Sequence, residues 1–451
     1  MPVSPLDYRY GRDVAKEIWS REGRHARSLE VERALIWAHS KMGRVSPEDY
    51  DAIAEISDPG IVTADRVDEL EAETKHDIMA LTKAMAEAAG EAGWCVHLGA
   101  TSNDIVDSAV ALQIKDSIVI QKDSLQKLIL TMCEIAEREK STVMLGRTHG
   151  QAAVPITFGL KVAVWVDEMR RHLTRLDEIT LRCITGKFLG AVGTGAAQGE
   201  RALELQDLIL GELGLGIPVA TTQVVGRDRY IEWVAWMANV ATSIEKILQE
   251  VRNLQRTEIG EVAEAFDSKK QVGSSTMAHK KNPITSENAC GLARIVRSMI
   301  TPSFENALLW HERDLANSSS ERFTLSHSMI LLDDVISKCD RVLSGLVVNR
   351  DRMLDNIESQ NGLIMAEKLM LELVDRGMAR DSAHEELRSA SMIAVERGAN
   401  LEDVCRDLKS IMEHFDEEEI SGLFDPRSHL GSSVAIVENA VSIARKHISE
   451  Q

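Results

Sequence analysis

The sequence predicts an all-α protein in which a bundle of long helices is flanked by smaller helical domains at the N- and C-terminal ends. Long stretches of the chain contain neither Gly nor Pro, and their apolar residues recur every three to four positions, as on one face of a helix. Aromatic residues make up only 4% of the chain, which favours the packing of helix on helix. The chain has 451 residues, and single cores stop growing at about 250–300 residues, so we expect two or three structural units.

Four long helices make up the predicted bundle, at 100–145, 156–180, 230–259 and 303–344. The apolar residues that recur along the helix at 100–145 are Val106, Val110, Leu128, Met132 and Ile135. Those along the helix at 156–180 are Phe158, Val162, Trp165, Met169, Leu173 and Leu176. Those along the helix at 230–259 are Val234, Met237, Val240, Ile244, Ile247, Val251 and Leu254. At 1.5 Å per residue, a helix of ~45 residues is about 68 Å long, too long for one compact domain. Its apolar flank is expected to pack on other copies of the chain, so we expect a homo-oligomer.

The regions on either side of the bundle are divided into shorter segments. Prolines and glycines interrupt residues 1–104, and glycines interrupt the chain again after about residue 349. We therefore expect an N-terminal helical domain at 1–104, the central long-helix bundle at 105–349, which would form the oligomer core, and a C-terminal helical domain at 350–451.

The formal net charge of −19 argues against a nucleic-acid partner and against an anionic membrane surface. An anionic ligand would need a local cluster of Arg and Lys. No cysteines form a CxxC pair, so we expect reduced, buried thiols and no zinc site. The cysteines are Cys95, Cys133, Cys183, Cys290, Cys339 and Cys405. The N-terminus has no apolar segment and no run of 18 apolar residues occurs, so we expect a cytoplasmic protein.

Two segments between the predicted helices have a composition that suits neither helix surface nor core. Residues 97–104 read HLGATSND; their hydroxyl and carboxyl groups either cap the following helix or, with its free N–H groups, bind an anion. Residues 146–151 read GRTHGQ and contain His149. A single histidine is more often structural, but the glycines allow a ligand to approach closely.

The segment 273–283 is the most informative. Its Gly-Ser-Ser opening offers successive N–H groups for an anion, and Lys280 and Asn282 add a positive charge and an amide donor. A flexible basic surface loop is the alternative interpretation. Glu287, which follows shortly, has the chemistry to orient an imidazole and raise its pKa.

These segments resemble the signature regions of the fumarase/aspartase superfamily of lyases. The pattern Gly-Ser-x-x-Met-x-x-Lys-x-Asn at 273–282 matches the superfamily signature at every fixed position. Within the superfamily, the chain resembles the adenylosuccinate lyase family over essentially its whole length. The segments that carry this resemblance are KHD (75–77), HLGATSND (97–104), GRTHGQAAVPITFG (146–159), GAVGT (190–194), TQ and RDR (222–229) and LWHERDLANSSSER (309–322).

The chain departs from the family pattern at three positions. Ala278 stands where the family usually has Pro, and Lys75 and Lys281 stand where it often has Arg. Lysine keeps the charge but loses the planar fork of arginine, so these changes affect the expected grip on phosphate or carboxylate rather than the chemistry.

The resemblance implies a lyase that eliminates fumarate from adenylosuccinate, giving AMP, and from the succinylated aminoimidazole carboxamide ribotide of purine biosynthesis. In such a β-elimination a proton leaves the carbon next to a carboxylate, and nitrogen leaves the neighbouring carbon. The aci-carboxylate intermediate carries two negative charges, so the site must concentrate donors and cations there. Proton transfer and electrostatics suffice for this reaction, so we expect no metal and no organic cofactor.

The resemblance also assigns roles. Ser274 is the expected general base and His149 the general acid, with Glu287 as its orienting partner. Lys280 and Asn282 would stabilise the intermediate. The purine and ribose side would be lined by Lys75, His76 and Asp77, with His76 a further catalytic candidate. The nucleotide and its phosphate would be held by Arg9, Tyr10, Arg313, Ser318 and Arg322. The succinyl carboxylates would be held by Thr101, Ser102, Thr148, Gln223 and Ser275, with Asn288 nearby. In this family the site is shared among the subunits of a homotetramer.

Two other functions remain open. One is another lyase of the superfamily, of the argininosuccinate lyase or carboxymuconate cycloisomerase type; His279 and the segment 313–322 favour the adenylosuccinate lyases. The other is a non-catalytic helical scaffold, against which the retention of Ser274, His149 and Lys280 argues.

Overall fold

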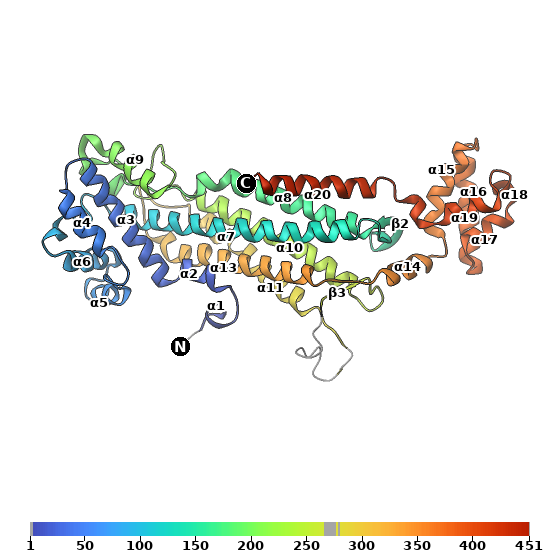
Figure 1. Ribbon diagram of the computed structural model, residues 1–451, viewed down its shortest axis with the longest axis horizontal. Coiled ribbons are helices and arrows are strands. Elements are labelled where there is room, and N and C mark those ends of the chain that lie inside the picture. The colour runs from blue at the N-terminus through green and yellow to red at the C-terminus, as the bar shows by residue number, and fades with distance from the viewer. Residues whose placement is uncertain (1–2, 266–276, 278–279, 451) are drawn as a thin grey trace. The chain divides into compact units, whose positions relative to one another are not determined.

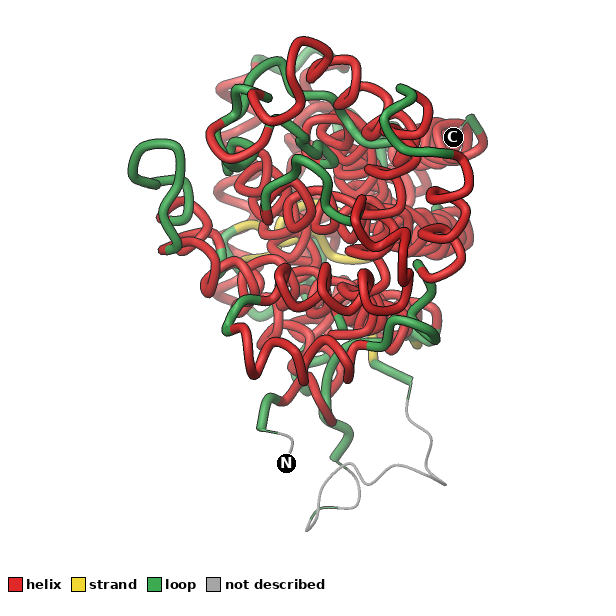
Figure 2. The backbone as a smooth tube through the Cα atoms, turned by 90° about the vertical axis from the view of Figure 1, so that its left-hand side faces the viewer, coloured by secondary structure: helices red, strands yellow, loops and turns green. Residues whose placement is uncertain are grey.

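The computed structural model describes residues 3–265, 277 and 280–450. In this part of the chain helices account for nearly all regular structure, and the strands form two short antiparallel pairs, β1–β2 and β3–β4 (Figure 2). The predicted all-α class is therefore confirmed. None of the described helices is both long enough and apolar enough to cross a membrane.

The chain divides into two compact units. The first comprises Met1–Leu125, His172–Glu245 and Ala289–Ser337, and the second comprises Gln126–Arg171, Lys246–Asn288 and Lys338–Gln451. The boundary falls within five long helices: α7 (Ser102–Arg138), α8 (Phe158–Cys183), α10 (Asp228–Leu254), α11 (Ile284–Ser298) and α13 (Ala316–Ser344). The expected division into three domains at 104 and 349 stays a prediction.

The first unit begins with short helices whose starts follow from their capping residues. The side chains of Ser20, Ser46, Thr63 and His76 accept N–H groups at the starts of α3, α4, α5 and α6. The helices of this unit, besides those at the boundary, are α1 (Pro5–Tyr8), α2 (Asp13–Trp19), α3 (Arg21–Lys41), α4 (Pro47–Ile56), α5 (Ala64–Thr74), α6 (Asp77–Ala89), α9 (Ala202–Leu213) and α12 (Ile300–Glu305), with the 3-10 turns η1 (Gly90–Cys95), η2 (Gly190–Val192) and η3 (Ala196–Arg201).

The second unit contains the strands and the C-terminal helices. These are β1 (Val143–Thr148), β2 (Gln151–Thr157), β3 (Val262–Ala263), β4 (Val347–Val348), α14 (Arg350–Glu358), η4 (Leu363–Met365), α15 (Ala366–Asp375), α16 (Arg380–Arg397), α17 (Leu401–Asp407), α18 (Lys409–Met412), α19 (Glu417–Phe424), η5 (Pro426–His429) and α20 (Ser433–Ser449) (Figure 1). Helices α15 to α19 pack around one apolar core that includes Leu369, Leu387 and Ile420.

The predicted stripes of α8 and α10 are confirmed as core. Every residue of both stripes is buried, from Phe158 to Leu176 and from Val234 to Leu254. All six cysteines are free and buried, as expected. Burial raises the pKa of several of these thiols, to about 11 for Cys133.

Three predicted helices were too long, and the one expected at 230–259 ends at Leu254. The first ends at Arg138 rather than at 145, because Val143 and the residues after it form β1. The fourth begins at Ala316 rather than at 303. The Asp314 carboxylate accepts the N–H groups of Trp310 and Ala316, both at 2.8 Å, and so closes a turn just before α13. The end of α7 and the start of α13 both fall within stretches that contain neither Gly nor Pro, so the sequence pattern did not reveal them.

Candidate active site

His149 lies at the tip of the hairpin formed by β1 and β2, in an unusual backbone conformation. Thr148 pairs with Gln151, so His149 and Gly150 form a two-residue turn, with φ values of 55° and 75°. Positive φ at both central residues is typical of a type I′ turn, which matches the twist of the strands. Non-glycine residues with positive φ are uncommon and cluster at functional sites. Thr148 and His149 are both exposed, so the turn presents them to a ligand.

Two contacts fix this hairpin within the second unit. Val143 and Leu145 pack in a small apolar cluster with residues of α14 and η4. Arg147 makes a bidentate ion pair, at 2.7 and 3.0 Å, with the fully buried carboxylate of Glu261. The position of His149 therefore depends on a rigid support rather than on a mobile loop.

The start of α11 carries Glu287 and Asn288, and Glu264 positions it. The Glu264 carboxylate accepts the N–H groups of Thr285 at 3.3 Å and Ser286 at 2.7 Å, and the Ser286 hydroxyl at 2.5 Å. This carboxylate occupies N–H groups that a helix otherwise offers to an anion, so this terminus is not a free anion site. Glu287 is exposed on the same turn.

Lys280 and Asn282 precede this helix. Lys280 is exposed and its N–H donates to the carbonyl of Met277 at 3.0 Å. The carbonyl of the neighbouring Lys281 accepts from the side chain of Gln255 at 3.1 Å. Ser274 and Ser275 lie outside the described residues, so their expected roles stay predictions.

In the first unit, the turn between α5 and α6 presents Lys75, His76 and Asp77. Lys75 ends α5 with a φ of 57°, a second positive value at a predicted site residue. The Nδ1 atom of His76 accepts the N–H of Met79 as the cap of α6, and its Nε2 atom lies 3.5 Å from the hydroxyl of Ser102. The structure thus brings together His76 and Ser102, which are 26 positions apart in the sequence.

A cavity of about 430 Å³ lies in the first unit, between residues of α3, α5, α6, α7 and α13. Arg313, Ser318 and Arg322, three of the predicted phosphate-binding residues, line it together with Asp77. Val106 and Val110 also line it, so this end of the α7 stripe faces the cavity. Small-molecule sites commonly have volumes of about 300–1,000 Å³.

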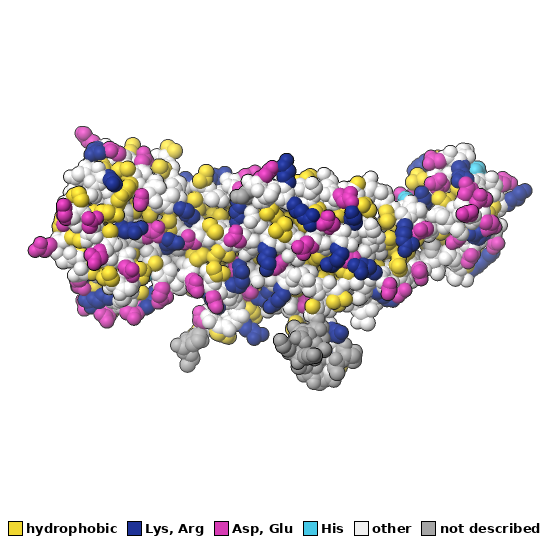
Figure 3. Space-filling model, viewed as in Figure 1, with side chains coloured by type: hydrophobic (Ala, Val, Ile, Leu, Met, Phe, Trp, Pro, Cys, Tyr) yellow, Lys and Arg dark blue, Asp and Glu magenta, His cyan; other side chains and the backbone are white. Residues whose placement is uncertain are grey.

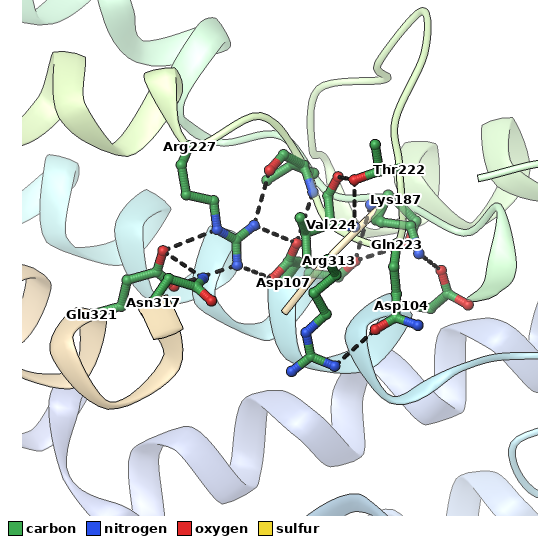
Figure 4. A network of polar contacts seen from close by, with 12 residues as sticks. Asp104, Asp107, Lys187, Thr222, Gln223, Val224, Arg227, Arg313, Asn317 and Glu321 are labelled. Atoms are coloured by element: carbon green, nitrogen blue, oxygen red, sulfur yellow. Dashed lines mark hydrogen bonds and ion pairs between the residues drawn. The ribbon is translucent and has the colours of Figure 1, made fainter. Parts of the chain in front are cut away.

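Asp104 and Asp107, near the N-terminal end of α7, each form a buried ion pair (Figure 4). Asp104 pairs with Lys187, and both side chains are almost fully buried. Asp107, one turn further along, accepts from Arg227 at 2.8 and 3.0 Å. Arg227 also pairs with Glu321 of α13 at 2.9 Å. Burial raises the pKa of Asp104, and the Lys187 ammonium opposes this shift.

These pairs hold the surrounding loops on α7. The second oxygen of the Asp104 carboxylate accepts the N–H of Thr101 at 2.8 Å, so the capping interpretation of 97–104 is supported. Asp107 accepts the N–H of Val225 at 2.8 Å, which fixes the loop that carries Gln223. The Gln223 side chain in turn accepts from Arg313 at 2.8 Å (Figure 4).

Other predicted residues lie away from the lining of this cavity. Arg9 and Tyr10 follow α1 and are not among the residues that line the cavity. The chain just beyond them is attached to α13, since the N–H of Gly11 donates to Asp334 at 3.2 Å. His149 and Glu287 make no ion pair with each other among the described residues, and their pairing stays a prediction.

Arg24, Glu261 and Glu264 were not singled out from the sequence. Arg24 lines the cavity, while Glu261 and Glu264 hold the hairpin and the start of α11. Each is separated along the chain from its partners, and each has the local pattern of an ordinary surface residue. Only the fold brings Arg24 to the cavity, Glu261 to the hairpin and Glu264 to the start of α11.

Comparisons with known proteins support the predicted family. Residues 7–297 match the family model described as lyase, and residues 362–440 match the model of the adenylosuccinate lyase C-terminus. The adenylosuccinate lyase of Pyrococcus abyssi is 45% identical over 442 residues, which are 98% of each protein. The chain belongs to the adenylosuccinate lyase family. The family's enzyme from Methanothermobacter thermautotrophicus is 43% identical, over 99% of this chain and all of the relative.

Solved structures show the same superfamily fold. A 3-carboxy-cis,cis-muconate lactonizing enzyme from Pseudomonas putida superposes with a TM-score of 0.89 and 30% identity, covering 98% of this chain and 99% of that one. A fumarate lyase from a Mesorhizobium strain has a TM-score of 0.88 and 30% identity, covering 98% and 100%. The expected fold of the fumarase/aspartase type is confirmed.

Proposed function

We propose that this chain eliminates fumarate from adenylosuccinate, giving AMP, and from the succinylated aminoimidazole carboxamide ribotide. The observation that carries this proposal is the cavity in the first unit. It has the size of a small-molecule site, and it is lined by Arg313, Ser318 and Arg322, which the family resemblance assigns to the phosphate. A chain with a net charge of −19 needs such a local group of cations to bind a multiply charged anion.

The proposed chemistry uses the residues of the second unit. Ser274 takes the proton from the carbon beside a carboxylate, and the electrons of that C–H bond form the aci-carboxylate. When this intermediate collapses, the C–N bond breaks and His149 protonates the departing nitrogen. Lys280 and Asn282 stabilise the two negative charges of the intermediate. The exposed turn that carries His149, and the exposed position of Lys280, support these roles.

We propose further that the active form is a cytoplasmic homotetramer with sites shared between copies. Large apolar side chains are exposed on the long helices and on the segment before α13, and apolar patches appear between charged side chains in Figure 3. Those of the first unit include Val119, Leu308, Trp310, Leu315 and Phe323. Trp310 is 76% exposed three positions before Arg313, which suits a surface that a second copy covers next to the site.

A substrate panel tests the reaction. The purified chain is mixed in turn with adenylosuccinate, argininosuccinate and 3-carboxy-cis,cis-muconate, and the change in ultraviolet absorbance is followed. We expect fumarate and AMP in equal amounts from adenylosuccinate and no turnover of the other two. Turnover of either alternative at a higher kcat/KM, or no turnover of adenylosuccinate by folded protein, would overturn the proposal. A His149→Asn variant, whose new residue tolerates the same turn, is the inactive control.

A further inference from the structure

The cavity of the first unit contains a cation that the sequence did not single out. Arg24 of α3 lines the cavity, and its guanidinium lies 3.9 Å from the Oδ2 atom of Asp77. The guanidinium of Arg322 lies 3.8 Å from the same oxygen. Both distances exceed that of a hydrogen bond, so the N–H groups of the two arginines are not taken up by this carboxylate. The Arg24 side chain is 33% exposed, and this exposure leaves it accessible from the cavity.

The carboxylate of Asp77 is shared between these two cations, and the charge of Glu71 acts on Arg24 as well. Two guanidinium groups share the single carboxylate of Asp77, and arginine does not lose its proton in proteins. Burial and the neighbouring Arg322 lower the pKa of Arg24, and the charges of Asp77 and Glu71 oppose this shift without cancelling it. An anion placed between the two arginines would offset the repulsion between their positive charges.

Arg21, Arg227 and Arg313 also line the cavity, and Arg313 donates to the neutral side chain of Gln223. Arg227 is paired with Asp107 and Glu321. Arg21 is paired with Glu22, Asp65 and Asp68. Arg24 and Arg322 differ from Arg21 and Arg227, because they share one carboxylate, that of Asp77, at distances longer than a hydrogen bond.

Ser318 adds a hydroxyl donor at the same place. It lies four positions before Arg322 on α13, so the two side chains point to the same side of the helix, and both line the cavity. Two guanidinium forks and one hydroxyl suit a tetrahedral dianion with several acceptor oxygens.

We propose that Arg24 is a further substrate-binding residue, which with Arg322 binds the phosphate group of the succinylated nucleotide. This inference rests on the proposed function for the identity of the substrate. Asp77 then holds the two guanidinium groups in position before the phosphate arrives. A purely structural role is the rival explanation: Arg24 would only tie α3 to α6 through Asp77.

Substrates with and without the phosphate separate these roles. The Arg24→Gln variant is compared with wild type on adenylosuccinate and on its dephosphorylated form, succinyladenosine. We expect kcat/KM for the nucleotide to fall by about 10- to 100-fold, chiefly through KM, as on loss of one hydrogen bond to a charged group. The value for the nucleoside should change little. Equal losses on both substrates, or no loss on either, would overturn the inference.

Arg27→Gln is the matched control. Arg27 lies one turn further along α3, has a side-chain exposure of 34%, and pairs with Glu30 and Asp116 rather than facing the cavity. The Arg27→Gln substitution should change kcat/KM for the nucleotide and for the nucleoside by the same factor. Arg24→Lys keeps the charge but loses the planar fork, so a smaller rise in KM for the nucleotide alone is expected. If Arg24→Gln is unstable in thermal denaturation, Arg24→Lys replaces it in the comparison of nucleotide with nucleoside.

Calorimetry provides a readout that is independent of turnover. Wild type should bind AMP more tightly than adenosine, and Arg24→Gln should lose most of this difference. If wild type shows this difference and Arg24→Gln loses it, but wild type has no lyase activity, the proposed function fails and the assignment of Arg24 stands. If wild type releases fumarate and Arg24→Gln binds AMP and adenosine as wild type does, the assignment fails and the proposed function stands.

Discussion

Lys280 and Arg322 are both exposed cations, but they are expected to act at different stages of the reaction. Lys280 belongs to the signature segment 273–282, where we expect negative charge to grow on the aci-carboxylate. Arg322, on α13, lines the cavity and is expected to bind a phosphate, whose charge does not change during the reaction. An interaction made only in the transition state affects kcat, whereas one shared by substrate and transition state affects KM.

Substitution of each cation by methionine tests this distinction. Lys280→Met should lower kcat and kcat/KM together by about 100- to 1,000-fold, the usual effect of losing one such donor. Arg322→Met should chiefly raise KM. Steady-state kinetics on the two variants decides the matter, and a Lys280→Met enzyme with a normal kcat and a raised KM would contradict the assigned role.

The segment 97–104 depends on a second charged contact, between His97 and Glu32. The imidazole Nδ1 of His97 donates to the Glu32 carboxylate at 2.6 Å, and the carboxylate is fully buried. His97 has a φ of 61°, so the contact holds it in a conformation that such residues rarely adopt. Burial alone would lower the pKa of His97, but the charge and hydrogen bond of Glu32 raise it above its ordinary value.

This contact predicts a pH-dependent stability. Because the folded pKa of His97 is raised, its contribution is complete below the unfolded pKa of about 6.5 and is lost as the pH rises through the folded pKa. Glu32→Gln should therefore lower the free energy of unfolding at pH 6 by about 1.5–3 kcal/mol, the range for a hydrogen bond to a charged group. The loss should shrink toward pH 9. Urea denaturation at both pH values measures it, and an equal loss at both would contradict this explanation.

At the scale of single elements, the start of α7 depends on its two buried ion pairs. Lys187 and Asp104 have side-chain exposures of 0% and 1%, so removal of either charge leaves the other without compensation. Lys187→Met should destabilise the chain by about 3–5 kcal/mol. The double variant Lys187→Met with Asp104→Asn should be less destabilised than Lys187→Met alone. Chemical denaturation of Lys187→Met, Asp104→Asn and the double variant measures the coupling, and additive losses would contradict a direct pair.

The long helices were predictable because their apolar residues recur over several turns, and the burial of Phe158 to Leu176 follows from that period alone. The hairpin at 143–157 was missed because its strands are short and follow a helix without an intervening Gly or Pro. The His149–Gly150 pair, with positive φ at both residues, was the local sign of this turn. Contacts such as Ser286 to Glu264 join distant positions and cannot be read from local pattern.

At the scale of the whole molecule, the exposed apolar side chains predict an oligomer. Val119 and Phe323 are 57% and 59% exposed on α7 and α13 of the first unit. Leaving such residues in water is unfavourable, since burial of one large apolar side chain stabilises by roughly 1.5–3 kcal/mol. Light scattering at assay concentrations should give the mass of four chains. A fully active monomer would contradict this prediction.

Most of the predicted site residues that the structure describes fall into two sets. The first unit holds His76, Ser102, Gln223, Arg313 and Arg322, and the second holds His149, Lys280 and Glu287. If copies of the chain share their sites, two variants that are each inactive can restore one another when they are mixed.

Mixing Ser274→Ala with His149→Asn tests most directly whether residues from different copies serve one elimination reaction. Each variant alone should be folded and nearly inactive. After subunit exchange, verified by mass spectrometry of tagged chains, a site draws both intact residues about a quarter of the time if the chains mix at random in a tetramer. We therefore predict that fumarate release from adenylosuccinate recovers to about a quarter of the wild-type rate. No recovery in verified mixed tetramers would contradict a site shared between copies.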